Sequence, residues 1–232
     1  SGTTDNFSVV LTSEPTATVT LTLSDNDSTE VLYPTSLVFG SGNWSTSQMI
    51  TLTGKDDNVS DDNQTTLLTL TPSGGDYGSV SAQTLTVTTS DNDTAGLTIV
   101  ESGSGTTAVE GGDNDTFTVR LASRPTGSVV LSVQASNSAD VSVNPTTLSF
   151  DNSSSSWQTA QTVTVSAVND AVDDDNVTST ITISVNTSST TDGKYDLVSS
   201  DNLTVVTVSD NDTVGLVLSK SSGVVSENGS VS

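Results

Sequence analysis

The chain repeats itself, and this repeat limits its fold more than any other feature. DNFSVVLTSEPTATV, starting at Asp5, parallels DTFTVRLASRPTGSV, starting at Asp115. Likewise, TVTTSDNDTAGLTI from Thr86 parallels VVTVSDNDTVGLVL from Val205. The matching blocks keep their order, which is typical of tandem domains. If each SDND closes a domain, residues 94–212 form one complete repeat of the size of a β-sandwich domain.

The two repeats differ at their beginning. Residues 1–93 contain no partner for GLTIVESGSGTTAVEGG, the stretch from Gly96, whereas residues 213–232 do match it. We therefore expect a first sandwich, residues 1–93, that lacks its own first strand. A complete sandwich, 94–212, follows, and 213–232 carry the first strand and loop of a further repeat. This phase fits a window of a longer array, or a tail strand donated to a neighbouring identical chain.

The apolar residues alternate with Thr and Ser at a period of two, in short runs bounded by Gly, Pro, Asn and Asp. About seven such runs in the complete repeat, and the absence of a helical stripe, predict an all-β fold of tandem immunoglobulin-like antiparallel β-sandwiches. Trp44 and Trp157 precede matching strands, and we expect both rings to pack in the cores. The expected strands of the complete repeat are 96–99, 116–121, 128–133, a bent pair over 141–150, 162–167, 177–185 and 203–208.

Composition excludes several functions. The chain has 28 acidic and five basic residues and a formal charge of −23, which would repel nucleic acid and anionic lipid. It has no His and no Cys, so the usual general base, thiol nucleophiles and metal–thiolate sites are missing. No apolar run approaches the roughly 20 residues of a membrane span. We therefore expect neither an enzyme nor a membrane-inserted protein.

The acidic residues, mostly Asp, gather in loops that strand parity places at one pole of each sandwich. In the complete repeat these loops are VEGGDND, VNDAVDDDN and SDND. Such carboxylates repel one another unless a cation neutralises them, and Ca²⁺ takes six to eight oxygen ligands. Solvated turns are the alternative interpretation of each loop. We expect calcium, with the other repeat contributing Asp56, Asp57, Asp61, Asp62, Asp91 and Asp93, and with Glu227 as the tail residue that matches Glu110.

These motifs resemble Calx-beta domains and the related tandem immunoglobulin-like repeats of large prokaryotic adhesin, filament or surface-layer proteins. The early V-E-G, the acidic loop after the fifth strand, a Tyr before the last strand (Tyr77, Tyr195) and the closing D-N-D carry the resemblance. It implies calcium at this pole and a role as extender, adhesin or calcium sensor. Carried over by position, the ligands are Glu110, Asp170, Asp173, Asp175, Asp210 and Asp212.

Thirteen of the sixteen asparagines lie in Asn-X-Ser/Thr sequons. N-glycosylation is therefore one hypothesis, and metal-loop and turn chemistry that happens to match the sequon is the other. Away from the acidic pole, the candidate acceptors are Asn6, Asn43, Asn152, Asn186 and Asn202.

Together, the sequence predicts a structural extender or filament-forming repeat of an extracellular or cell-surface protein, stiffened by calcium at the joints between domains. Its partners would be neighbouring repeats or identical chains. One alternative is an adhesin that binds glycans or other surface ligands through the opposite loops, at Arg124 and Pro125 or 151–156. Another is a calcium-sensing regulatory ectodomain.

Overall fold

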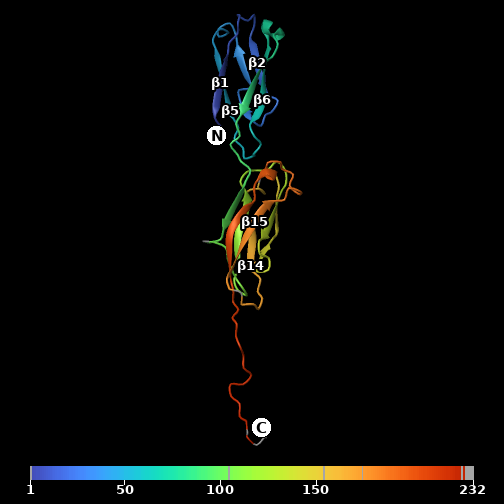
Figure 1. Cartoon of the computed structure of the whole chain (residues 1–232). Helices are drawn as coiled ribbons and strands as arrows, with labels where there is room; N and C mark the ends of the chain where they lie inside the picture. Colours follow the sequence, from blue (N-terminus) through green and yellow to red (C-terminus); the bar gives the residue numbers. More distant parts are fainter. Residues whose placement is uncertain (1, 104, 154, 174, 226, 228–232) are drawn as a thin grey trace.

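Two β-sandwiches follow one another along a common axis, and an extended tail leaves the second (Figure 1). The computed structural model describes residues 2–103, 105–153, 155–173, 175–225 and 227. We name residues 2–93 the N-terminal domain, residues 94–212 the C-terminal domain, and residues 213–227 the tail. The tail extends from the end of the C-terminal domain that lies away from the N-terminal domain (Figure 1).

The C-terminal domain has two sheets, with strand orders β12-β14-β10-β8 and β13-β11-β15-β16-β9. Every pair is antiparallel except β9 and β16, which run parallel. The all-β sandwich prediction is thus confirmed. The elements are β8 (Leu97–Glu101), β9 (Thr107–Val109), β10 (Asp115–Leu121), β11 (Val129–Ala135), β12 (Val141–Asn144), β13 (Thr147–Phe150), β14 (Gln161–Ala167), β15 (Val177–Val185), η2 (Tyr195–Leu197) and β16 (Asp201–Ser209).

The N-terminal domain repeats this plan with one strand fewer in each sheet. Its strand orders are β1-β5-β3 and β4-β2-β6-β7. Among the described residues no strand covers β1 as β8 covers β10, or β7 as β9 covers β16. The elements are β1 (Thr4–Val9), β2 (Val19–Ser24), β3 (Val31–Leu32), β4 (Ser36–Phe39), β5 (Gln48–Gly54), β6 (Gln64–Ser73), η1 (Gly75–Ser79) and β7 (Gln83–Thr89).

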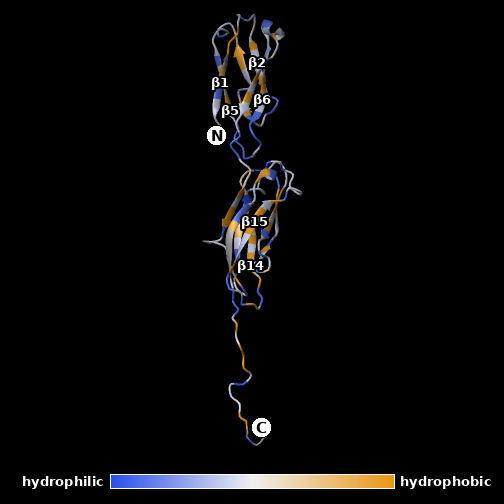
Figure 2. Cartoon of the chain, viewed as in Figure 1, coloured by the Kyte–Doolittle hydropathy of each residue, from blue (hydrophilic) through white to orange (hydrophobic). Residues whose placement is uncertain are grey.

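Period-two alternation builds both cores, because successive side chains of a strand point to opposite faces of the sheet. In β10, Phe117, Val119 and Leu121 are buried while the residues between them are more exposed. Ile181 and Ile183 of β15 face them from the other sheet as members of the same core. In Figure 2 hydrophobic and hydrophilic residues accordingly alternate along the strands.

The prediction for the two tryptophans is right for one of them only. Trp157 is 8% exposed and belongs to the core of the C-terminal domain. Trp44 is partly exposed and lies outside the described core of the N-terminal domain. Both stand in the turn before a strand. The described core of the N-terminal domain is also the smaller of the two.

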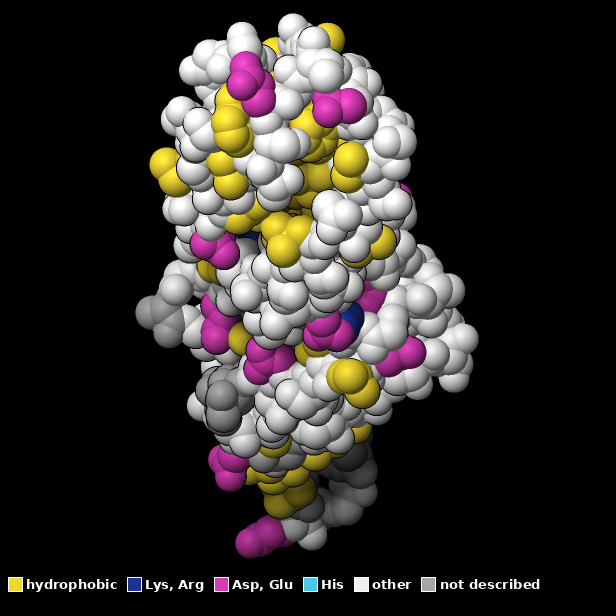
Figure 3. Space-filling model, turned by 90° about the horizontal axis from the view of Figure 1, so that it is seen from above, with side chains coloured by type: hydrophobic (Ala, Val, Ile, Leu, Met, Phe, Trp, Pro, Cys, Tyr) yellow, Lys and Arg dark blue, Asp and Glu magenta, His cyan; other side chains and the backbone are white. Residues whose placement is uncertain are grey.

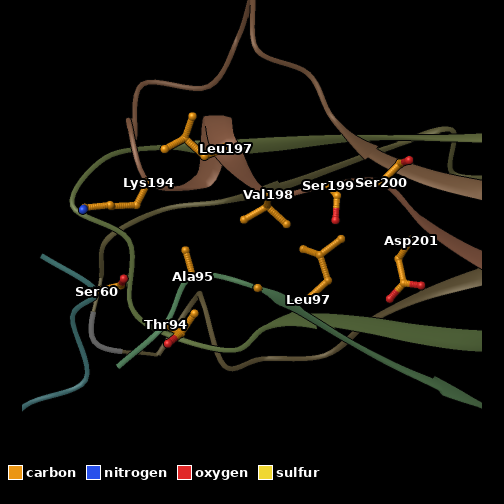
Figure 4. A pocket seen from close by; sticks show the side chains of 11 residues that line it. Ser60, Thr94, Ala95, Leu97, Lys194, Leu197, Val198, Ser199, Ser200 and Asp201 are labelled. Carbon is orange, nitrogen blue, oxygen red and sulfur yellow. The ribbon is translucent and has the colours of Figure 1, made fainter. Parts of the chain in front are cut away.

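A short joint connects the domains and uses loops of both. The backbone N–H of Arg124 donates to the carbonyl oxygen of Asn58 at 2.6 Å, and Val59 forms an isolated parallel bridge with Arg124. The Lys194 ammonium forms an ion pair with Asp62. An open pocket lined by Ser60, Ala95, Lys194 and Leu197, among others, lies between these loops (Figure 4).

Candidate metal centre

Three acidic side chains meet where the chain leaves the C-terminal domain. One carboxylate oxygen each from Glu110, Asp210 and Asp212 lies within 4.8 Å of the others. Strand pairing brings them together: Glu110 follows β9 and Asp210 follows β16, and these two strands run parallel. The Glu110 N–H continues the ladder by donating to the Ser209 carbonyl oxygen at 3.1 Å. Parallel strands end at the same edge, so both acids project at one pole.

Side-chain hydrogen bonds hold the SDND turn in shape. Asp210 Oδ1 accepts the Asp212 N–H at 2.8 Å, and the Asp210 N–H donates to Asn176 Oδ1 at 3.1 Å. Asn211 Nδ2 donates to the Glu110 carbonyl oxygen at 2.6 Å and to Asn169 Oδ1 at 3.0 Å. The turn therefore ties together the loops after β9, β14 and β16.

Gly111 makes this close approach possible. Its φ is +62°, and a Cβ at this position would lie 2.8 Å from Asn169 Oδ1. A side chain here would be strained by the positive φ and would displace the side-chain amide of Asn169. The glycine that follows the glutamate in the V-E-G motif thus has a structural role of its own.

The geometry fits a hard cation. Glu110 is only 6% exposed, and Asp212 Oδ2 is buried without a hydrogen-bond partner among the described residues. A buried carboxylate oxygen without a donor costs about 1–3 kcal/mol or more. Ca²⁺ takes oxygen ligands at about 2.3–2.6 Å, so three carboxylate oxygens within 4.8 Å of one another can share one such hard cation. The lack of His and Cys in the sequence disfavours softer metals.

The other three predicted ligands of this domain are not members of this group. Asp170, Asp173 and Asp175 are exposed in the loop after β14 and are not part of the 4.8 Å group. Asp170 Oδ1 accepts the Val172 N–H at 2.7 Å, and Asp173 Oδ2 accepts the Val214 N–H at 2.9 Å. Asp174 falls outside the described residues.

Asp115, within the VEGGDND loop, has a structural role. It accepts hydrogen bonds from the Ser102 hydroxyl, from the Thr107 N–H at 2.9 Å and from the Thr116 N–H at 2.7 Å. These bonds, the Ser102 bond first, lower the pKa of Asp115. Its carboxylate holds β9 against β10 and is directed at protein donors.

The N-terminal domain has the same turn. Asp91 Oδ1 accepts the Asp93 N–H at 2.7 Å, and the Asp91 N–H donates to Asn63 Oδ1 at 3.0 Å. Asp91 Oδ2 also accepts the N–H groups of Asp61 and Asp62, each at 3.0 Å. The SDND turn therefore forms in both repeats, and in this domain it closes the pole that faces the joint.

Burial and neighbouring negative charges raise the pKa values of two acids at this second pole. Burial, followed by the charge of Asp57, raises the pKa of Asp61, and burial, followed by the charge of Asp91, raises the pKa of Asp93. Asp61, Asp91 and Asp93 are half-buried, whereas Asp56, Asp57 and Asp62 are exposed. The described residues of this domain contain no 4.8 Å group like that of Glu110. The matching Glu227 is exposed in the tail.

Sequence reasoning missed Glu30. It is 9% exposed, and its burial raises its pKa, with Asp61 and Asp57 among the charges that add to this effect. Its carbonyl oxygen accepts the Lys55 N–H at 2.8 Å, just as the Asp140 carbonyl oxygen accepts the Val168 N–H at 2.8 Å. The alignment of the two repeats contained the signal, since an acid precedes the matching strands β3 and β12.

Most candidate glycosylation sites are accessible. Asn6, Asn43, Asn152 and Asn202 are exposed, and Asn186 is partly buried. Asn43 Nδ2 donates to the Val38 carbonyl oxygen at 3.1 Å, and Asn152 Nδ2 donates to the Thr126 carbonyl oxygen at 3.3 Å. A glycan at either nitrogen would therefore have to compete with a backbone contact.

Seen along the long axis, acidic side chains are spread over the visible face and few basic ones accompany them (Figure 3). Within the described part of the chain, no helix has the length and hydrophobicity needed to cross a membrane.

Comparisons with known proteins give weak structural similarity only. No family model matches the chain, and no curated protein matches it. The calcium binding domain CBD12 of CALX1.1 is similar at 14% identity and a TM-score of 0.34, over 90% of this chain and 94% of the other. The S-layer protein SbsC matches at 19% identity and a TM-score of 0.35, over 82% of this chain and 19% of its own. A chaperone–tip adhesion subunit complex of Csu pili from Acinetobacter baumannii matches at 9% identity and a TM-score of 0.28, over 88% of this chain and 90% of the other.

Proposed function

We propose that this chain is a non-enzymatic structural repeat of an extracellular or cell-surface protein, in which calcium stiffens the joint at the end of each sandwich. The observation that carries the proposal is the grouping of Glu110, Asp210 and Asp212 at the point where the chain leaves a domain. The group lies at a junction rather than in a cleft. A cation there would fix the direction in which the next segment leaves the domain.

Each acidic pole adjoins the following segment. Asp173 Oδ2 accepts the N–H of Val214, the second residue of the tail, at 2.9 Å. In the N-terminal domain, Asp62 pairs with Lys194 of the next domain. Calcium at Asp61, Asp91 and Asp93 would offset both the burial of these carboxylates and the repulsion from neighbouring acids, which together raise the pKa values of Asp61 and Asp93.

The joint also occupies the loop that an adhesin would need. Besides the contact of its N–H with Asn58, Arg124 donates from Nε to the Asn152 carbonyl oxygen at 3.0 Å. The Arg124 backbone is therefore engaged in the joint, and its side chain is bonded to residue 152 of the same domain, which favours the structural role over ligand binding at these loops.

Calcium titration tests the proposal. Calcium binds the native state selectively, so at 100 times its Kd it should stabilise the C-terminal domain by about 2.7 kcal/mol. Glu110→Gln should lose most of this stabilisation, whereas Glu14→Gln, an exposed control, should keep it. Chelation should leave the sandwiches folded and increase the spread of interdomain distances in small-angle scattering. Equal melting curves and scattering with millimolar calcium and with chelator would refute the proposal.

A further inference from the structure

The C-terminal domain has an open groove at one edge of its sandwich. Its two sheets end in β8 and β9 on one side and in β12 and β13 on the other. Only residues 129–132 of β11 pair with β13, so the second half of β11 faces β12 across the space between the sheets. The groove lies there, has a volume of about 410 Å³, and is lined by residues 133–135 and 141–143 together with Ser138 and Thr146.

The groove is apolar inside and carries no charge. Val133 and Val141, both 0% exposed, belong to the core of the domain. Ala135 and Val143 pack against this core and are partly exposed. Although the chain has 28 acidic residues, none of the residues that line the groove is charged. The groove therefore suits a neutral and largely apolar group.

The N-terminal domain places a tyrosine at the equivalent position. In both domains a valine of the edge strand pairs with the last residue of the next strand, and two positions further stands Tyr33 in one domain and Val143 in the other. Asp25 and Ala135 likewise stand four residues after equivalent leucines, which pair with β4 and β13. The groove of the C-terminal domain is thus lined by the two residues that replace Tyr33 and Asp25.

Tyr33 and Asp25 connect the two sheets of the N-terminal domain. Tyr33 follows β3 of one sheet and packs against the core, and Asp25 follows β2 of the other sheet. Burial, followed by a hydrogen bond to Asp25, raises the pKa of Tyr33 to about 12. Val143 and Ala135 have no ring and no acceptor that could make this connection. A phenol ring is therefore the group that one repeat holds between its sheets and the other repeat leaves out.

The backbone of β12 offers an edge for docking beside the groove. In the described part of the chain no strand pairs with its outer side. The Val168 N–H donates to the Asp140 carbonyl oxygen at 2.8 Å, and bonded and non-bonded pairs alternate along an antiparallel ladder. The N–H and C=O groups of Val143 therefore point away from β14, toward the free edge. Because opposite residues of neighbouring strands share a face, an added strand would direct the side chain opposite Val143 into the groove.

We propose that this groove binds a tyrosine side chain of a partner protein, presented by an extended segment that pairs with β12. Backbone hydrogen bonds to the free edge would hold the segment, and the ring would occupy the space between the sheets. Ser138 and Thr146, which also line the groove, carry hydroxyl groups that can hydrogen-bond to the phenol. None of the three acids of the metal centre lines the groove, so the proposal does not rest on the calcium role.

A peptide titration of the full chain tests the proposal, with NMR shifts of backbone amides as the readout and chelator present throughout. The probe is acetyl-Thr-Thr-Tyr-Thr-Thr-amide, and the comparisons are the same peptide with a central alanine and free p-cresol. The tyrosine peptide should shift the amides of Val143 and Ala135 and bind about tenfold or more tightly than either comparison. Absent shifts at these amides, or equal binding of the two peptides, would overturn the proposal. Equal binding of p-cresol and the tyrosine peptide would overturn docking on β12.

An exchange of residues between the domains locates the site. Val143→Tyr with Ala135→Asp gives the C-terminal domain the pair of the N-terminal domain and should abolish peptide binding. Ser149→Tyr is the control, because it adds a ring at an exposed position of β13 outside the groove, and it should bind like the wild type. Tyr33→Val with Asp25→Ala should open a second site in the N-terminal domain. Unchanged binding by the filled variant would overturn the proposal. If its melting curve shows that the filled variant is unfolded, the absence of a second site in the opened variant would do so instead.

Discussion

Tyr195 and Tyr77 make the same hydrogen bonds in different surroundings. The Tyr195 hydroxyl donates to the Ser123 carbonyl oxygen at 2.7 Å and accepts the Ser123 N–H at 3.1 Å. The Tyr77 hydroxyl donates to the Ser13 carbonyl oxygen at 3.0 Å and accepts the Ser13 N–H at 3.1 Å. Yet Tyr195 is fully buried and Tyr77 is partly exposed. The hydrogen bonds come from segments that both domains possess.

The difference in burial comes from the opening segment. Tyr195 belongs to the core against which Ala95, Leu97 and Ile99 pack, and the N-terminal domain has no counterpart of these residues among those described. The same holds for the acid shortly before each tyrosine: Asp192, 1% exposed, accepts four hydrogen bonds, whereas the exposed Asp76 accepts two from Thr16. The hydrogen bonds of the turn are thus local, whereas the burial of the turn depends on strands from a different part of the sequence.

The largest expected effect compares Phe117→Ala with Phe7→Ala. Removing a fully buried ring should cost about 3–5 kcal/mol of unfolding free energy in the C-terminal domain. Truncating the partly exposed Phe7 should lower the unfolding free energy of the N-terminal domain clearly less, because part of the ring is already in water. Denaturant unfolding followed by tryptophan fluorescence reports each domain, since Trp44 and Trp157 lie in different domains.

The control for this comparison is Val38→Ala, which truncates an exposed residue of β4 and should be nearly neutral. Equal losses for the two phenylalanines at low concentration would contradict the interpretation that the N-terminal core is open.

A second comparison, smaller in size, sets Asp192→Asn against Asp76→Asn. Burial alone would raise the pKa of Asp192, but the hydrogen bonds from the Tyr195 and Thr126 N–H groups, among others, outweigh it and lower the pKa. A carboxylate with a lowered pKa contributes stability above its unfolded value, near 3.8, and loses it as the pH falls through the folded value. Hydrogen bonds to a charged group contribute about 1.5–3 kcal/mol each at most, so Asp192→Asn should destabilise strongly at pH 7.

Acid titration of stability checks this prediction. Below pH 4 the C-terminal domain of Asp192→Asn should lose less stability with falling pH than that of the wild type. The difference in unfolding free energy between the two should therefore shrink as the pH falls. Asp76→Asn should change the N-terminal domain much less, because water already solvates that exposed carboxylate. A pH-independent difference for Asp192→Asn would show that the charge is not the source of the effect.

The sequence predicted the parts of the fold that repeat and alternate. The six single strands and the bent pair expected in the complete repeat all formed within two residues of their predicted outer bounds, because they have alternating apolar positions. It missed β9, whose three residues Thr107–Val109 are too few to show a period. That omission matters, because the parallel pairing of β9 with β16 places Glu110 beside Asp210.

The candidate site shows the same limit. Loop parity brought the right loops to one pole, but only the ladder geometry selects Glu110, Asp210 and Asp212 from among the acids there. Asp170 and Asp175 look equally suitable by residue type and lie exposed in their loop. Which carboxylates converge depends on distances of a few ångströms across three loops, and spacing along one sequence does not contain them.

The smallest expected effect tests how far the joint is held by charge. Lys194 pairs with Asp62 across the domains, with side chains 33% and 78% exposed, so solvent screens the pair. Exposed ion pairs contribute about 0.2–1 kcal/mol, so Lys194→Ala should lower hydrogen-exchange protection of the Arg124 amide at most about fivefold. That amide is a direct probe because it donates to Asn58 across the joint. High salt should reproduce the effect in the wild type and add nothing to the variant, and Lys220→Ala in the tail should leave protection unchanged. Unaltered protection in Lys194→Ala would show that the backbone contacts hold the joint without help from the ion pair.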